Sequence, residues 1–285
     1  MHISRTISDI RATVGAFRQA GESIGLVTTM GALHDGHLAL ISEARAAHER
    51  VIATIFVNPT QFGNASDLKN YPRTEASDIA KLEAAGTDAV FIPESREIYP
   101  DGDETFVETE RLANMLHGLV RPGHFRGVAT VVAKLFNIIQ ADAAYFGEKD
   151  YQQLQVIRRM VRDLHIPISV RGVTTVRESD GLAMSSRNVR LAPEDRIAAR
   201  VLNKALENAE AIVKNRPDVA TLTNEISAMI SAEPRARLVG IDITEATTLA
   251  PLAGPINQRV AIMISVAFGE GDNEVLLIDQ REIEP

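Results

Sequence analysis

Short apolar runs alternate with amphipathic helical patterns along the first two thirds of the chain. The runs are rich in apolar and β-branched residues, which is typical of buried strands in a parallel sheet. They lie at 24–29, 51–57, 89–92, 143–146 and 168–176, and helical spacing occurs between them at 37–49, 74–85, 127–140 and 150–164. This order predicts an α/β fold with a doubly wound parallel sheet, in which ligands bind at the carboxyl ends of the strands.

The pattern changes after about residue 176. A polar segment precedes one long amphipathic helix predicted at 192–214, and a second helix is predicted at 219–232. Strand-like segments follow at 238–244, 259–268 and 274–278 with short connections, which indicates a small antiparallel sheet. We therefore predict two domains: residues 1–180 with the parallel sheet, and residues 181–285 as a smaller C-terminal α+β domain.

Composition narrows the class of protein. The chain has 285 residues, 45% of them hydrophobic, which is enough for a well-buried core. It has no cysteine, which excludes disulfides and thiolate zinc sites and fits a reducing cytoplasm. No stretch reaches the roughly 18 apolar residues of a membrane span. The net charge of -8 disfavours nonspecific nucleic-acid binding. We expect a cytoplasmic protein with no membrane or nucleic-acid partner.

The stretch "TMGALHDGH", residues 29–37, places two histidines at a predicted strand-to-helix junction. Helix starts present unpaired N–H groups that favour phosphate, and Gly31 and Gly36 let a nucleotide approach the backbone. An imidazole can donate a proton or a hydrogen bond to a phosphoryl group. Alternatively, His34 and His37 are polar loop or capping residues. A metal site is a weaker alternative, because no nearby carboxylate is placed as a third ligand.

Other polar groups lie at similar junctions. Lys149 in "GEKD" puts a compact positive charge before a predicted helix, although such a residue is often only part of a solvated cap. The "MSSR" segment at 184–187 combines hydroxyls with a guanidinium that can hold pyrophosphate, and would otherwise be a polar linker. Gln61 and Gln153 can bond hydroxyl groups without adding charge, and would otherwise be surface or turn amides.

The histidine stretch resembles the ATP-binding signature of the pantothenate synthetase family (pantoate:beta-alanine ligases, AMP-forming), a variant of the HIGH motif of a nucleotidyltransferase superfamily. Four further blocks occur in the family's order: "FVNPTQFG" at 56–63, "YPRT" at 71–74, "YFGEKDYQQL" at 145–154 and "VRESDGLAMSSRN" at 176–188. The resemblance covers about residues 24–191. One departure is Thr28, where the family usually has proline.

The resemblance implies a Rossmann-like first domain that binds ATP and pantoate, and a C-terminal lid. It implies ATP-dependent condensation of pantoate with beta-alanine to pantothenate through pantoyl adenylate, with release of AMP and pyrophosphate. This reaction belongs to pantothenate and coenzyme A biosynthesis. ATP would be a substrate, Mg²⁺ would accompany it, and the protein would be a homodimer.

The same resemblance implies the roles of individual residues. His37, assisted by His34, and Lys149 would be catalytic, and Gln61 and Gln153 would hold pantoate. Gln61 would also lie close to beta-alanine, with Asn58 assisting. No residue is predicted as a direct protein ligand of the metal. The residues implied in ATP binding are Met30, Gly31, Ala32, Leu33, His34, Asp35, Gly36, His37, Gly147, Glu148, Lys149, Asp150, Val176, Met184, Ser185, Ser186 and Arg187.

Some assignments stay open on the sequence. The segment "RPGHFRG" at 121–127 is either a positive site for phosphate or carboxylate, or a solvated loop. Asp78 is either an exposed helix-cap residue or a water-mediated Mg²⁺ contact. Competing functions are a related nucleotidyltransferase that keeps the nucleotide in its product, a class I aminoacyl-tRNA synthetase, and a non-enzymic adenine-nucleotide sensor. Release of AMP would separate the first of these from a ligase.

Overall fold

The computed structural model describes the backbone of residues 1–285 and all side chains except those of residues 65–67 and 272. The chain forms two compact units. The first comprises residues 1–147 and 152–173, and the second comprises residues 148–151 and 174–285.

A parallel sheet forms the centre of the first unit. Its strand order is β1-β4-β3-β2-β5-β6, and every neighbouring pair is parallel. The strands are β1 (His2–Ser4), β2 (Ile24–Thr29), β3 (Arg50–Ile55), β4 (Ala89–Phe91), β5 (Ala143–Gly147) and β6 (Ser169–Val173). The doubly wound parallel sheet is therefore confirmed. The chain proceeds from β2 toward one edge and from β5 toward the other, so a topological switch point lies between these two neighbours.

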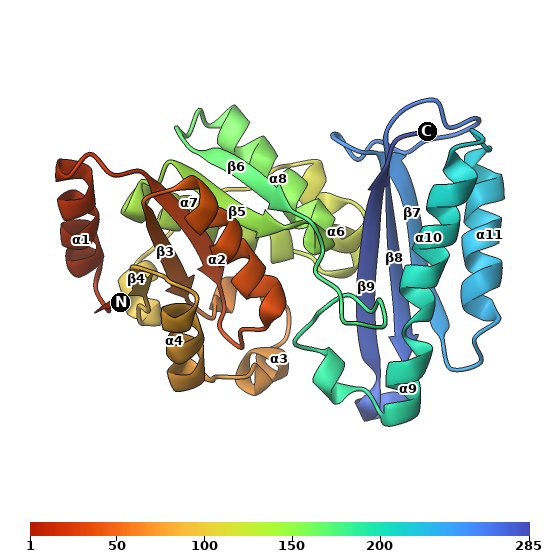
Figure 1. The fold of residues 1–285 in the computed structure, drawn as a ribbon, viewed down its shortest axis with the longest axis horizontal. Helices are drawn as coiled ribbons and strands as arrows, with labels where there is room; N and C mark the ends of the chain where they lie inside the picture. Colours follow the sequence, from red (N-terminus) through yellow and green to blue (C-terminus); the bar gives the residue numbers. More distant parts are fainter. The chain divides into compact units, whose positions relative to one another are not determined.

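Helices cover both faces of this sheet. On one face α2 packs against α4, and on the other α1 packs against α7 (Figure 1). Apolar residues such as Leu40, Ile41 and Ala44 of α2 are buried against the strands. The helices of the sheet layers are α1 (Ile7–Gln19), α2 (Asp35–Ala47), α4 (Glu75–Ala84), α7 (His124–Ile139) and α8 (Tyr151–Asp163). Shorter elements are α3 (Ala65–Asn70), α5 (Ser95–Ile98), α6 (His117–Val120), η1 (Pro59–Gln61), η2 (Leu112–Asn114) and η3 (Glu148–Asp150).

Some helices and strands of the first unit differ from the prediction. The pattern missed β1, which has only three residues, and it missed α1. The run at 168–176 was expected to be a buried strand, but β6 is shorter and only partly buried because it lies at the edge of the sheet. Helix α2 begins at Asp35 instead of residue 37, because His34 provides the N-cap.

The second unit contains the predicted antiparallel sheet, with order β7-β8-β9, which is confirmed. Its strands are β7 (Arg237–Glu245), β8 (Val260–Phe268) and β9 (Val275–Ile283). Every residue of β8 is buried, since β8 is paired on both sides and is apolar throughout except for Ser265. Helices α10 (Val201–Val213) and α11 (Val219–Ser231) lie side by side against this sheet (Figure 1). The short elements are α9 (Pro193–Ala198), η4 (Asn188–Arg190) and η5 (Gly271–Asn273).

The prediction of one continuous helix at 192–214 is wrong. The segment forms α9 and α10, which are separated at Ala199 and Arg200. At this junction two backbone N–H groups bond to the carbonyl three residues earlier, as in a 3-10 helix. Arg200 N–H donates to the Ile197 carbonyl at 3.4 Å, and Leu202 N–H donates to the Ala199 carbonyl at 3.2 Å. The apolar spacing continues through the junction, and for that reason the break is not visible in the pattern.

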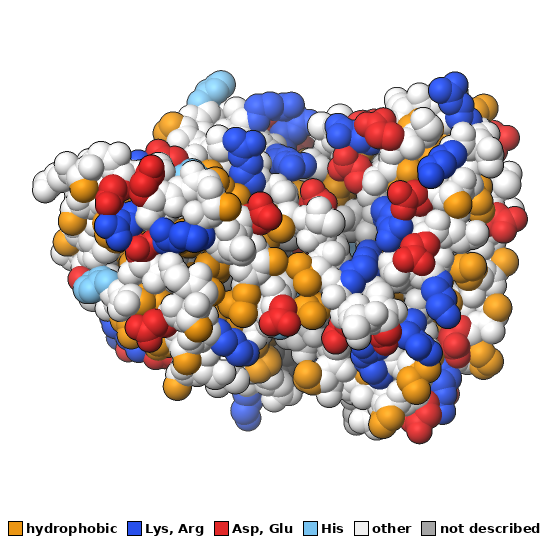
Figure 2. Space-filling view, in the orientation of Figure 1, with side chains coloured by type: hydrophobic (Ala, Val, Ile, Leu, Met, Phe, Trp, Pro, Cys, Tyr) orange, Lys and Arg blue, Asp and Glu red, His pale blue; other side chains and the backbone are white. Residues whose placement is uncertain are grey.

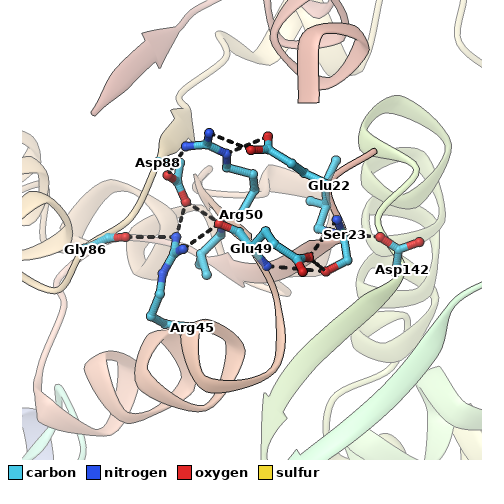
Figure 3. Close-up of polar contacts among 10 residues, drawn as sticks. Glu22, Ser23, Arg45, Glu49, Arg50, Gly86, Asp88 and Asp142 are labelled. Atoms are coloured by element: carbon cyan, nitrogen blue, oxygen red, sulfur yellow. Dashed lines mark hydrogen bonds and ion pairs between the residues drawn. The ribbon is translucent and has the colours of Figure 1, made fainter. Parts of the chain in front are cut away.

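The amino ends of the parallel strands lie together along one side of the sheet, which we call its amino edge; the opposite side, with the carboxyl ends, is the carboxyl edge. The amino edge carries a network of charged side chains (Figure 3). Asp88, just before β4, accepts hydrogen bonds from the Val51 N–H at 2.7 Å and from Arg50 at 2.9 Å, and it also pairs with Arg45. Burial acts to raise the pKa of Asp88, but these hydrogen bonds outweigh burial and hold the pKa below its ordinary value. Asp142, just before β5, similarly accepts from the Ile24 N–H at 2.6 Å. These carboxylates tie the starts of neighbouring strands together.

Charge on the surface is mixed. Figure 2 shows Lys and Arg side chains interspersed with Asp and Glu side chains on the face that it draws. Within the described part of the chain, no helix is both long and apolar enough to cross a membrane.

Candidate active site

The loop between β2 and α2 carries both predicted histidines. His34 is the N-cap residue of α2, and its Nδ1 accepts a hydrogen bond from the Gly36 N–H at 3.2 Å. His37 reaches back in the same way, with its Nδ1 accepting from the His34 N–H at 3.3 Å. The two ring centroids lie 4.2 Å apart. The capping interpretation of these residues is therefore confirmed.

Capping does not exclude chemistry, because it uses only one nitrogen of each ring. A nitrogen that accepts a hydrogen bond carries no proton, so the neutral forms of His34 and His37 carry theirs on Nε2. Each ring is thereby fixed in the tautomer whose Nε2–H is a donor. Two such donors at the start of a helix suit phosphate oxygens, since the backbone N–H groups and the dipole there also favour negative charge.

The backbone before His34 is tightly held. Gly31 and Ala32 both have left-handed backbones, with φ of 81° and 52°. The Gly31 N–H donates to the Thr29 hydroxyl at 3.1 Å. The carboxylate of Asp78 accepts the next two N–H groups, those of Ala32 and Leu33, each at 2.9 Å. Asp78 is completely buried, so the expectation of an exposed helix cap is wrong.

A buried amide pair follows β3. Asn58 is 1% exposed, and its Nδ2 donates to Gln61 Oε1 at 3.0 Å and to the Gly127 carbonyl at 3.1 Å. Its Oδ1 accepts from the Tyr99 hydroxyl at 2.8 Å. Because Gln61 Oε1 accepts from Asn58, the Gln61 amide is oriented and its Nε2 is the remaining donor group. Gln61 is itself buried, so of the two alternatives, a surface or a turn amide, the surface position is wrong, and the residue lies in the short turn η1.

Helix α7 supports this amide pair closely. A Cβ on Gly127 would lie 2.6 Å from the Thr60 carbonyl oxygen, so only glycine allows this approach of α7 to η1. The Arg121 guanidinium donates to His124 Nε2 at 3.3 Å, and therefore His124 Nδ1–H donates to the Gln61 carbonyl at 2.9 Å. His124 is buried and holds the backbone of Gln61.

The two glutamines at the start of α8 have different environments. Gln152 is buried, and its Nε2 donates to the carbonyls of Leu112 and Met115 at 2.9 and 2.7 Å. Its Oε1 accepts from the His117 N–H at 3.1 Å. Gln153, the residue that the sequence assigned to pantoate, is partly exposed on the first turn of the helix. The structural role of Gln152 was not predicted, because its partners lie more than 30 residues away.

In the second unit, the segment before "MSSR" forms a hairpin. The Met184 N–H donates to the Val176 carbonyl at 2.9 Å, and the turn contains Gly181 with a φ of 93°. Arg177 joins this hairpin to β9 through two hydrogen bonds to Asp279, at 2.6 and 3.0 Å. Asp279 is 1% exposed. The hairpin is therefore fixed to a buried strand of its own unit.

Two of the predicted ATP-binding segments meet within the second unit. Lys149 and Ser185 line the same small pocket, together with Leu182, Ala183, Asn188, Leu202, Leu277, Ile278 and Asp279. Arg187 donates to the Leu276 carbonyl at 3.1 Å, so this guanidinium also lies against β9. Residues of these two segments are therefore neighbours within the second unit.

No cluster of three or more His, Asp or Glu that could hold a metal ion occurs among the residues that the structure describes. Asp78, one suggested Mg²⁺ contact, has both carboxylate oxygens bonded to backbone N–H groups. The described protein groups do not form a dedicated metal cage.

Comparison with known proteins decides the family. The family model for pantoate-beta-alanine ligase matches residues 2–282. The chain belongs to this family. Pantothenate synthetase from Agrobacterium fabrum is 47% identical over 284 residues, which are 99% of this chain and 96% of the relative. The enzyme of the same name from Heliobacterium modesticaldum is 49% identical over 268 residues, 93% of this chain and 95% of the relative.

Solved structures of family members agree with the fold. The crystal structure of pantothenate synthetase from Thermus thermophilus is 44% identical, covers 100% of both chains and has a TM-score of 0.92. The pantoate-beta-alanine ligase of Francisella tularensis, described as complexed with beta-gamma ATP and beta-alanine, is 35% identical with a TM-score of 0.79. The match covers 99% of this chain and 97% of the Francisella chain. The family resemblance, which rested on a few short blocks, is confirmed over nearly the whole chain.

Proposed function

We propose that this protein condenses pantoate with beta-alanine, using ATP, to give pantothenate, AMP and pyrophosphate. Family membership over residues 2–282 supports the reaction class. The observation that carries the assignment to this chain is the pair of His34 and His37 rings, each fixed with Nε2–H as donor at the carboxyl end of β2. That end adjoins the switch point of the sheet, where such folds bind nucleotides.

The proposed ATP contacts follow strand ends and the hairpin. They are residues 30–37 after β2, residues 147–150 at the end of β5, Val176, and residues 184–187 after the hairpin. In the second unit, the proximity of Lys149 and Ser185 supports this grouping. Gln61, oriented by Asn58, and Gln153 are proposed to hold pantoate, with Gln61 also near beta-alanine.

The chemistry needs alignment more than a strong base. The carboxylate of pantoate attacks the α-phosphorus of ATP, pyrophosphate leaves, and the amine of beta-alanine then attacks the acyl carbon and expels AMP. His37 and His34 would donate hydrogen bonds from Nε2 as charge develops on the phosphate. Lys149 would neutralise that charge, and Ser185, Ser186 and Arg187 would hold the leaving pyrophosphate.

Several further features are part of the proposal. Mg²⁺, when bound, would offset phosphate charge, and in the absence of a protein cage among the described residues it would arrive on the ATP phosphates. We assign ATP and pantoate binding to residues 1–180 and a lid function to residues 181–285, which would shield pantoyl adenylate from water. A homodimer and a cytoplasmic location remain predictions from the sequence.

The test is an assay of the purified protein with ATP, Mg²⁺, pantoate and beta-alanine, with mass detection of products. AMP and pantothenate should form together, and omission of any one substrate should abolish pantothenate. A product that retains the nucleotide would indicate a related nucleotidyltransferase. Binding of ATP without turnover under all conditions would indicate a nucleotide sensor and would contradict the ligase assignment.

A further inference from the structure

A buried carboxylate on α4 holds the loop that precedes the two histidines. Asp78 Oδ2 accepts from the Ala32 N–H at 2.9 Å and from the Thr74 hydroxyl at 3.0 Å, and Oδ1 accepts from the Leu33 N–H at 2.9 Å. The side chain is 0% exposed. A carboxylate at this depth is retained only where several donors surround it, and here two of the donors are consecutive backbone amides.

The shape of the loop depends on this contact. Ala32 has a left-handed backbone, which an L-residue with a side chain rarely adopts unless its surroundings impose it. Without Asp78, the N–H groups of Ala32 and Leu33 would lack an acceptor. Gly31 also belongs to this arrangement, because a Cβ there would lie 3.0 Å from Asp78 Oδ2.

A second residue of α4 bonds to a backbone carbonyl of the same loop. Lys81 Nζ donates to the Leu33 carbonyl at 2.6 Å. Both polar groups of the Leu33 backbone are therefore bonded to α4, one to Asp78 and the other to Lys81. His34 is the next residue, so its position, and through the cap that of His37, follows from where α4 holds Leu33.

We propose that Asp78 is a positioning residue for the adenylation step, with Lys81 as its assistant. This inference rests on the proposed function, in which His34 and His37 donate to the phosphates of ATP. Asp78 acts through the backbone of the loop that precedes His34. It fixes this loop so that the Nε2–H groups of His34 and His37 are oriented before ATP binds. Neither pantoate nor beta-alanine depends on this contact.

The decisive variant is Asp78→Asn, which keeps the volume of the side chain but turns one acceptor oxygen into an NH₂ group facing a backbone N–H. We expect kcat/KM for ATP to fall roughly 10- to 100-fold per folded molecule, the range that follows from a lost charged hydrogen bond and a displaced donor. The KM values for pantoate and beta-alanine should change by less than about twofold, since those substrates do not use the loop.

The matched control is Asp88→Asn at the opposite edge of the same sheet. Asp88 also accepts a backbone N–H, that of Val51, so this variant loses a comparable bond and some stability. Its kinetic constants per folded molecule should remain within about twofold of those of the unmodified protein. An equal loss of kcat/KM for ATP in both variants, or no loss in Asp78→Asn, would overturn the proposal.

A milder variant covers the case in which Asp78→Asn does not fold. Lys81→Met keeps the aliphatic stem and removes only the donor to Leu33, and we expect kcat/KM for ATP to fall roughly 3- to 10-fold. If kcat/KM for ATP is unchanged in Lys81→Met, α4 does not position the loop for ATP. The unmodified protein is assayed first: if it makes no pantothenate, the proposed function fails, whereas normal activity with insensitive variants rejects only the positioning role.

Discussion

The two edges of the parallel sheet use charged and polar groups in different ways. At the amino edge, Asp88 pairs with Arg45 and Arg50 and accepts a backbone N–H (Figure 3). Asp142 pairs with Arg18 and also accepts a backbone N–H, so both carboxylates join one strand to the next. At the carboxyl edge, His34 and His37 each accept a backbone hydrogen bond at Nδ1, and the Gln61 amide oxygen accepts from Asn58. The first arrangement joins neighbouring strands, and on the proposed function the second orients side chains toward a ligand.

Helix α2 shows this contrast within a single element. His37 lies in its first turn, at the carboxyl edge, and Arg45 lies in its last turn, at the amino edge. Arg45 donates to the Glu49 and Gly86 carbonyls at 2.7 and 3.1 Å and pairs with Asp88. Substitutions at the two ends of this helix should therefore separate catalysis from stability.

The largest effect is expected at the start of α2. His37→Ala removes one of the two aimed Nε2–H donors, and the rate of adenylate formation should fall roughly 10² to 10⁴-fold, as for a positioned proton or hydrogen-bond donor. The measurement is a single-turnover assay of AMP transfer to pantoate, with circular dichroism to confirm folding. A loss of less than about tenfold in a folded variant would reject a catalytic role for His37.

Lys149 extends the comparison to the end of β5. Lys149→Ala should reduce ATP-dependent adenylate formation by about 10²-fold, because a positive charge near the phosphates is lost. Preformed pantoyl adenylate with beta-alanine should restore much of the amide-forming half-reaction. If that half-reaction is equally impaired, Lys149 does not act through ATP.

At the other end of α2, we expect an effect on stability alone. Arg45→Met removes donors to two carbonyls and to Asp88, and the free energy of unfolding should fall by about 1–3 kcal/mol. The kinetic constants should stay within about twofold, because the proposed ligand contacts lie at the other edge of the sheet. Urea denaturation and steady-state kinetics on the same preparation measure both quantities, and a selective loss of kcat would contradict the separation of the two edges.

The smallest effect is a pH dependence of stability at the amino edge. The pKa of Asp88 is lower in the folded protein than in the unfolded chain, so its contribution to stability is present above about pH 4 and is lost as the pH falls below that value. The difference in Tm between the unmodified protein and Asp88→Asn should therefore narrow from about pH 6 to about pH 3. A constant difference over this range would show that Asp88 contributes nothing through its charge.

Local patterns predicted most of the elements but few of the contacts that hold the site. Runs such as 24–29 and 51–57 predicted the central strands, because these strands are buried along nearly their whole length and consist mostly of consecutive apolar residues. The bonds of Asp78 to Ala32 and of His124 to Gln61 join residues 46 and 63 positions apart. No sequence pattern predicts either pair, because each contact forms only when a crossover helix packs against the loop that follows a strand.

The sequence also misjudged residues that fit a local pattern but have a further role in the folded protein. Asp78 lies four residues after Thr74, which fits an exposed first turn of a helix, yet the side chain is completely buried against the loop of residues 31–33. His34 and His37 were interpreted as either capping or chemical groups, although the two roles use different ring nitrogens. Three-dimensional placement was needed to see that the alternatives are compatible.

The contact between Gly127 and Thr60 sets a limit for redesign of the enzyme toward other acids. Any side chain at 127 would push η1 away from α7 and would disturb Asn58 and Gln61 together. Libraries aimed at bulkier or differently branched acids should therefore keep this glycine invariant and diversify the side chains of α8 instead.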